Sequence, residues 1–158
     1  MSLISDRFNR RGTAGIYWTT ELDDYNRPTV ADIDAATKLA CDISDIDGLT
    51  GNHTPLIIRR ATSTHAIARP GRTSALTPTM LLYDSADDSS TVRPLFDLGN
   101  TGYLILAPHG LTGPGDRVEI IPATSAGNRD VWTAQNEGAR YEVTLTATAA
   151  PVTVEVSP

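Results

Sequence analysis

Hydrophobic and polar residues alternate along several segments of the chain, which is the pattern of strands with one buried face. Residues 140–148 alternate most regularly, so we expect every second side chain there to face a core. The inward set is Tyr141, Val143, Leu145 and Ala147. The same period predicts strands at 38–44, 76–83, 117–123 and 152–156. A chain built from such segments is mainly β.

Residues 76–108 give the most detailed prediction. A strand at 76–83 has Leu76, Pro78, Met80 and Leu82 on one face, and the polar run 84–90 follows it. A short helix at 92–98 comes next, with Ser90 or Thr91 as its cap and Pro94 in its first turn. Its apolar residues, Val92, Leu95, Phe96 and Leu98, are expected to close one open face of a sheet.

A glycine or asparagine at 99–100 should end this helix. The next segment, 103–107, is apolar at every position, so we predict a strand that is covered on both faces.

Residues that typically cap helices or form turns predict the remaining elements. Thr29, three residues before Asp32, should cap a short helical turn. A short strand is possible at 16–18, loops are expected at 45–48 and 125–130, and the segment 50–71 suggests a long projecting hairpin.

These elements favour an antiparallel β-sandwich with one or two short flanking α-helices, an extended N-terminal arm and an extended loop. We place the arm at residues 1–26 and a single β-sandwich domain at residues 27–158.

The charge balance restricts the partners. The 158 residues contain 13 Lys and Arg against 19 Asp and Glu, for a net charge of −6. Domains that bind duplex DNA are usually basic, so this acidic composition disfavours DNA binding. It still permits a surface that DNA moves past without being bound. Cys41 is the only cysteine, which excludes an internal disulfide and suits a small core residue. No apolar run is long enough for a membrane span or a signal peptide.

No catalytic, cofactor or metal motif is present. His53, His65 and His109 lack metal-ligand spacing, and no nucleophile elbow, P-loop or dinucleotide fingerprint occurs. The acidic residues between 42 and 47 resemble a calcium loop only faintly, because their spacing is wrong and no closing glutamate follows. Trp18 and Trp132 suit core or contact positions, with a sugar-binding face as the alternative. We therefore expect no enzyme and no cofactor.

Several short segments, in order, resemble the major tail tube proteins of long-tailed (siphovirus-type) phages of actinobacteria. They are RPT at 27–29 with AT at 36–37, LTPT at 76–79, YDSADD at 83–88, TGYLI at 101–105, GDRVEIIP at 115–122 and AQNEGARYEV at 134–143. The resemblance covers most of residues 27–150 and is weaker at 49–69 and in the first 25 residues.

The resemblance implies a β-sandwich subunit without catalytic residues. Six copies would form a ring, and stacked rings would form a tube that delivers DNA without binding it specifically. The expected partners are further copies, the tape-measure protein, the tail terminator and the distal tail protein, with no membrane involved. The location would be the virion tail, after synthesis in the cytoplasm of a bacterial host.

Under this interpretation, the outward faces of 38–44 and 140–148 would line the lumen. The candidate lumen residues are Lys38, Asp42, Glu142, Thr144 and Thr146. The loop 45–55 and the arm would make contacts between subunits. Those candidates are Asp45, Asp47, Asn52, His53, Arg10 and Arg11.

Two alternatives remain open. The first is another virion β-protein, such as a tail terminator, a head–tail connector or a capsid decoration protein. The second is a soluble binding module or small enzyme of the sandwich class.

Overall fold

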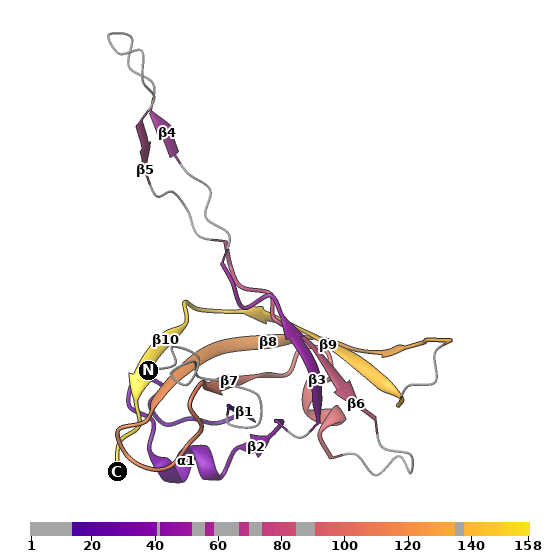
Figure 1. Cartoon of the computed structure of the whole chain (residues 1–158), viewed down its shortest axis with the longest axis horizontal. Coiled ribbons are helices and arrows are strands. Elements are labelled where there is room, and N and C mark those ends of the chain that lie inside the picture. The colour runs from indigo at the N-terminus through magenta and orange to yellow at the C-terminus, as the bar shows by residue number, and fades with distance from the viewer. Residues whose placement is uncertain are drawn as a thin grey trace, which may run out of the picture.

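The computed structural model describes residues 14–40, 42–51, 56–58, 67–69, 74–84, 91–134 and 138–158. Figure 1 shows a strongly curved sheet with a helix against one side and a hairpin that stands away from it. The elements are β1 (Gly15–Thr19), α1 (Val30–Asp34), β2 (Thr37–Lys38), β3 (Ile43–Asp47), β4 (Leu56–Ile58), β5 (Ile67–Arg69), β6 (Thr79–Tyr83), the 3₁₀ helix η1 (Arg93–Phe96), β7 (Thr101–Ala107), β8 (Arg117–Val131), β9 (Arg140–Ala147) and β10 (Val152–Glu155).

The main sheet is antiparallel and has the strand order β2-β1-β7-β8-β9-β6-β3, with β10 also paired to β8. β2 and β3 stand at opposite ends of this order, yet only residues 39–42 separate them. In a flat sheet these strands would be about 29 Å apart, at roughly 4.8 Å per step. Five Cα steps span at most about 18 Å. The sheet therefore curls until its two edges approach each other.

Backbone hydrogen bonds hold this connection at both edges. The Leu39 N–H donates to the Ile16 carbonyl of β1 at 2.8 Å. The Asp42 carbonyl accepts from the Tyr83 N–H of β6 at 2.8 Å. The strand predicted at 38–44 is thus wrong, because the chain turns here and crosses from one edge to the other. The buried Leu39 and the half-buried Ile43 pack into the same core from the two sides of the turn.

The curl creates an inner core and an outer core. The inner core holds Trp18, Phe96 and the inward side chains of β6 and β9, including the predicted Tyr141, Val143 and Leu145. The outer core holds Ile33 of α1 together with Ile105, Val118 and Ile120. β7 contributes Leu104 to the first core and Ile105 to the second, which confirms the strand covered on both faces.

The predicted helical turn after Thr29 is confirmed as α1. The Thr29 hydroxyl accepts from the Asp32 N–H, and the Asp32 carboxylate accepts from the Thr29 N–H, so a capping box fixes the helix start. Ser157 then ties the C-terminal segment to this end, because the Val30 N–H donates to the Ser157 carbonyl at 3.2 Å. Ile33 is thereby held against β7 and β8, where it seals the outer core.

The helix predicted at 92–98 is a shorter 3₁₀ helix, η1. Phe96 is fully buried against Trp18, with ring centroids 5.1 Å apart, so η1 closes one side of the inner core as expected. Two details of the prediction are wrong. Leu98 is 79% exposed instead of packing with Phe96, and Val92 is the N-cap, with no side-chain cap bond. Gly99 has a φ of +89°, which confirms it as the left-handed stop.

The loop predicted at 125–130 is part of a strand. β8 continues to Val131 and pairs with β9, with a bulge between Ser125 and Asn128. Polar residues occur there because the Ser125 hydroxyl and the Asn128 amide both donate to the Phe96 carbonyl. Those side chains bond to η1 and do not mark a turn.

The predicted fold class is confirmed, since the chain is mainly β and antiparallel with one short α-helix in its described part. The strand suspected at 16–18 is β1, which lies inside the sheet between β2 and β7. Residues 15–19 therefore belong to the domain and not to an arm. Residues 1–13 and Cys41 lie outside the described residues. No helix in the described segments combines the length and apolarity needed to cross a bilayer.

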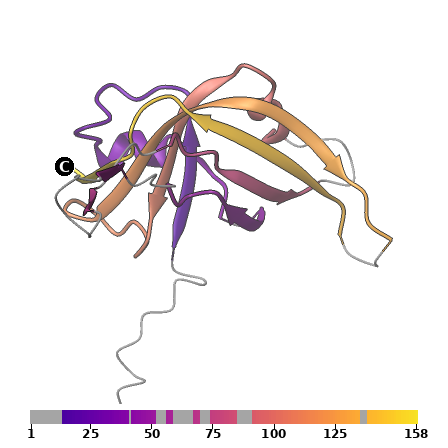
Figure 2. The same ribbon diagram turned by 90° about the horizontal axis from the view of Figure 1, so that it is seen from above.

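The projecting hairpin expected within 50–71 is present as β4 and β5, which form a two-stranded sheet of their own. Figure 1 shows this hairpin standing well away from the main sheet. Leu56 and Ile57 are 58% and 57% exposed on it. Figures 1 and 2 agree that the far ends of β8 and β9 also reach out from the body, in a different direction.

Gly102 allows β7 to lie close to β1. An added Cβ would lie 2.6 Å from the Thr19 carbonyl oxygen and 2.6 Å from Trp18 Cζ2. We expect Gly102→Ala to lower the free energy of unfolding by about 2–3 kcal/mol, because the clash is with backbone. Gly113→Ala is the control, since a Cβ there meets open space, and its change should stay within about 0.5 kcal/mol. Equal urea midpoints for the two variants would contradict this packing.

Candidate functional site

On the side opposite the inner core, β3, β6 and β9 carry no packed layer from the described part of the chain. Residues that pair directly across antiparallel strands point to the same side. Asp45 pairs with Leu81, which pairs with Glu142, and Glu142 pairs with Arg129 of β8. A second row joins Asp47, Thr79 and Thr144. We call these two rows the outer polar face.

The predicted lumen residues divide into two groups. Glu142 and Thr144 lie in the two rows, and Thr146 continues the same side of β9, opposite Thr124. Lys38 lies on β2, at the other end of the strand order. Asp42 is half-buried in the turn between the edges. The structure therefore brings three of the five together and separates Lys38 and Asp42 from them.

The predicted contact residues Asp45 and Asp47 lie beside the lumen candidates. Both are exposed on β3, which pairs only with β6 among the described strands. The outer polar face therefore runs directly to an open sheet edge. Asn52, His53, Arg10 and Arg11 lie outside the described residues.

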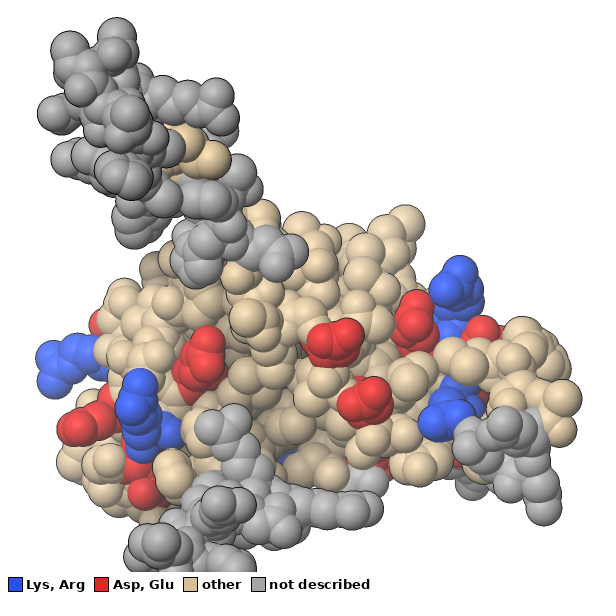
Figure 3. Space-filling model, turned by 45° about the horizontal axis from the view of Figure 1, so that its top comes forward, with Lys and Arg blue, Asp and Glu red and all other residues tan. Residues whose placement is uncertain are grey.

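The outer polar face carries charges of both signs. Asp45 and Asp47 are at its β3 edge, whereas Arg129 and Arg140 are at its β8–β9 end. Arg129 is 81% exposed and contacts Glu142 at 3.3 Å, so this pair is screened by water and contributes little to stability. Figure 3 shows one face of the molecule with acidic side chains over its middle and Lys and Arg toward its ends. Within the described segments, no group of three His, Cys, Asp or Glu residues is placed to hold a metal ion.

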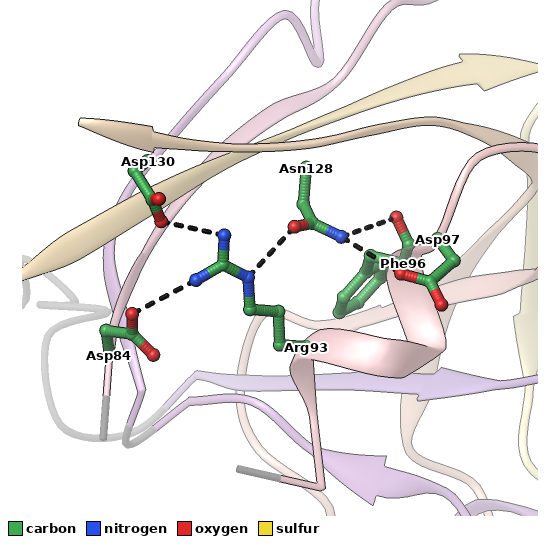
Figure 4. Close-up of polar contacts among 6 residues, drawn as sticks. All are labelled: Asp84, Arg93, Phe96, Asp97, Asn128 and Asp130. Carbon is green, nitrogen blue, oxygen red and sulfur yellow. Dashed lines mark hydrogen bonds and ion pairs between the residues drawn. The ribbon is translucent and has the colours of Figure 1, made fainter. Parts of the chain in front are cut away.

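A second polar cluster fixes the far half of β8. Figure 4 shows Arg93 of η1 reaching between β6 and β8. Its guanidinium contacts the Asp84 carboxylate at 3.1 Å and the Asp130 carboxylate at 2.7 Å. Its Nε donates to Asn128 Oδ1 at 2.9 Å, and its Cζ lies 5.1 Å from the Tyr141 ring centroid. We call this the Arg93 latch.

The latch keeps its charge. Desolvation, the largest single influence, lowers the pKa of Arg93, but the Asp130 hydrogen bond and the charges of Asp130 and Asp84 together raise it. Arg93 therefore remains a cation at neutral pH. The latch joins η1, β6, β8 and β9 and so positions one end of the outer polar face.

Known proteins share both the sequence pattern and the fold of this chain. The model of the phage tail tube protein family matches residues 1–158, the whole chain. The chain belongs to the phage tail tube protein family. The resemblance to tail tube proteins seen in the sequence is thus confirmed at the level of the family. No curated protein matches significantly.

Solved structures share the fold of this tail tube family member. One is from the sheath–tube complex of an extracellular contractile injection system (PVC), with TM-score 0.63, 12% identity and 99% of each chain covered. The sheath/tube terminator of that system has TM-score 0.61 and 12% identity, over 90% of this chain and 93% of its own. The tube terminating cap of the anti-feeding prophage has TM-score 0.60 and 13% identity, over 99% and 100%. The family and these neighbours are structural tail proteins.

Sequence reasoning missed the Arg93 latch. Its members are distant in the sequence, and Asn128 and Asp130 fall in the segment predicted as a loop. One local signal existed, because Arg93 directly precedes Pro94 in the predicted helix, where a charged side chain can point back toward the sheet.

We expect Arg93→Gln to lower the free energy of unfolding by about 1–3 kcal/mol. The change removes charge-assisted hydrogen bonds and leaves Asp84 and Asp130 close together without a cation. Arg129→Gln removes the same charge from the more exposed pair and should cost under about 0.5 kcal/mol. Urea unfolding of both variants measures the difference. A larger loss for Arg129→Gln would contradict the latch.

Proposed function

We propose that this tail tube protein assembles into hexameric rings that stack into the tail tube, through which DNA reaches the host. The observation that carries the proposal is the uncovered outer polar face that ends at an open sheet edge, in a chain of this family. A monomer gains nothing from an open edge, which is a risk for aggregation. In a ring, the same edge joins neighbouring copies.

The outer polar face suits the lumen. Its Thr79, Thr144 and Thr146 offer hydroxyls without charge, and its carboxylates repel phosphates. Arg129 is paired with Glu142, and the Arg140 guanidinium donates to the Ser44 hydroxyl at 3.4 Å. We therefore infer that DNA slides past this face without specific binding. Asp45 and Asp47, at the β3 edge of the same face, would lie at the lumen where two copies meet.

We further propose the setting of this assembly. The tube belongs to a long-tailed (siphovirus-type) phage of actinobacteria, as the short sequence segments suggest. Its partners are the tape-measure protein, the tail terminator and the distal tail protein. The subunit is made in the host cytoplasm, resides in the virion tail and has no enzymatic activity.

A second candidate, the tail terminator, has support from the fold, because two of the neighbours are a terminator and a terminating cap. Copy number separates the candidates. A tube subunit is among the most abundant virion proteins, whereas a terminator is present as a single ring. Quantitative mass spectrometry of purified virions measures this ratio.

Purified protein at high concentration should form rings or tubes with six-fold symmetry. Association is expected because the β3 edge, which pairs with β6 alone among the described strands, is available to a neighbouring copy. Negative-stain microscopy with sedimentation velocity measures it, with and without an initiating tail-tip partner. A protein that stays monomeric in every one of these conditions would contradict the proposed function.

The double variant Glu142→Lys with Thr144→Lys should form tubes that fail to deliver DNA, because it lines the lumen with cations that bind phosphate. The control is Asp34→Lys with Ala31→Lys, which makes the same charge change at exposed positions of α1, a helix that packs over β7 and β8 and not over β3, β6 or β9. Plating efficiency of phage complemented with each variant measures delivery. Normal infection by the Glu142 variant would show that this face does not line the lumen.

The β4–β5 hairpin is our candidate for contact between rings, together with Asn52 and His53, which precede it in the sequence. Leu56→Ser with Ile57→Ser should leave the fold intact but shorten or abolish tubes, since the two exposed apolar residues lose their partners in the next ring. Leu98→Ser, at an exposed apolar residue on the body, is the control. Tube length in micrographs measures the effect, and unchanged tubes would exclude the hairpin.

A further inference from the structure

Trp132 is unusually exposed for a tryptophan. It directly follows β8, where the strand end reaches out from the body (Figure 2), and its side chain is 91% exposed. Indole is the largest side chain, and burying it against an apolar partner is strongly favourable. An exposed tryptophan at a projecting tip is typical of an anchor in an interface.

A hollow of about 440 Å³ opens at the other end of the same strand. Small and apolar residues form most of its wall. Among the described residues that line it, Glu119 is the charged one. The residues that matter here are Leu49, Leu76, Ala147, Ala149, Pro151 and Glu119. A hollow of this size is in the range that accepts a compact aromatic group.

The hollow and the indole match chemically. An indole has an apolar body and one donor, its Nε1–H, and it usually needs an acceptor when buried. The hollow provides apolar walls and one carboxylate acceptor, on Glu119.

Trp132 cannot fill the hollow of its own chain. Glu119 lies at the start of β8 and Trp132 just beyond its end, with thirteen residue steps between them. At about 3.3 Å per residue, the strand path is roughly 40 Å, far longer than one side chain. The occupant suited to the hollow is therefore the tip of a second copy.

We propose that Trp132 of one copy inserts into the hollow of the next, with the Trp132 Nε1–H donating to the Glu119 carboxylate. This inference rests on the proposed self-assembly and names one of its contacts. Because the two halves of the contact lie at opposite ends of the subunit, the contact is head-to-tail. Such a contact repeats from copy to copy and closes into a ring if its rotation permits.

The test uses two variants that each lack one half of the contact. Trp132→Ala keeps the hollow, whereas Ala149→Arg keeps the indole and blocks the hollow. Each alone should need about thirtyfold more protein for half-assembly than the wild type, as for loss of an aromatic hot spot. Mixed at equal amounts, they retain one intact contact and should form a dimer of unlike copies. Sedimentation velocity measures both results.

Two further samples sharpen the experiment. Trp132→Phe keeps the apolar body but loses the donor, so its half-assembly concentration should rise only about fivefold. Leu98→Ala removes an exposed apolar side chain that does not line the hollow and should assemble like the wild type. Acrylamide quenching should show one accessible tryptophan before assembly and none after it, because Trp18 is already buried.

The outcomes separate the two proposals. If the wild type forms rings or tubes and Trp132→Ala does so equally well, the inserted indole is wrong while the proposed function stands. The inserted indole is also wrong if the mixed variants associate no better than each alone, or if Trp132 stays open to acrylamide in the assembly. If the wild-type protein never assembles, both proposals are contradicted, and the wild-type sample is enough to show this.

Discussion

The short connection between β2 and β3 is the constraint on which the rest of the structure depends. Residues 39–42 cannot bridge a flat sheet of this width, so the sheet has to curl. The curl encloses the inner core around Trp18 and Phe96, and no described segment packs on the opposite side of β3, β6 and β9. Packing inside and an uncovered face outside thus have one geometric cause.

The two ends of β8 have different support. Its first half is held from both faces, by the inner core on one side and by α1 on the other. Its second half depends on β9 and on the Arg93 latch, which uses ion pairs and hydrogen bonds in place of apolar burial. This difference lets the strand reach beyond the core and still carry Arg129 and Trp132 in defined positions.

Local patterns in the sequence predicted those parts of the fold that local physics decides. The alternation at 140–148, the capping of α1 by Thr29 and the stop at Gly99 all depend on neighbours a few residues apart. The turn at 39–42 was missed because an inward residue on each side of a turn gives the same alternation as a strand. The bulge of β8 was missed because Ser125 and Asn128 resemble loop residues until their bonds to Phe96 are seen.

The candidate site was only half predictable for a related reason. Glu142, Thr144 and Thr146 share one strand, so their period was enough to group them. The neighbours Asp45 and Leu81 come from the pairing of β3, β6 and β9, and register between distant strands is not encoded in any one of them. Lys38 was grouped with them only because the turn after it was taken for strand.

The pairing of β1 with β7 has a consequence during synthesis. β1 ends at Thr19, and its partner is complete only at Ala107. At about 5–20 residues per second, the ribosome takes roughly 4 to 18 seconds to make the intervening chain. For most of that time the apolar segment with Ile16, Tyr17 and Trp18 can pair only with the two-residue strand β2, so we expect chaperones to bind the nascent chain until β7 emerges.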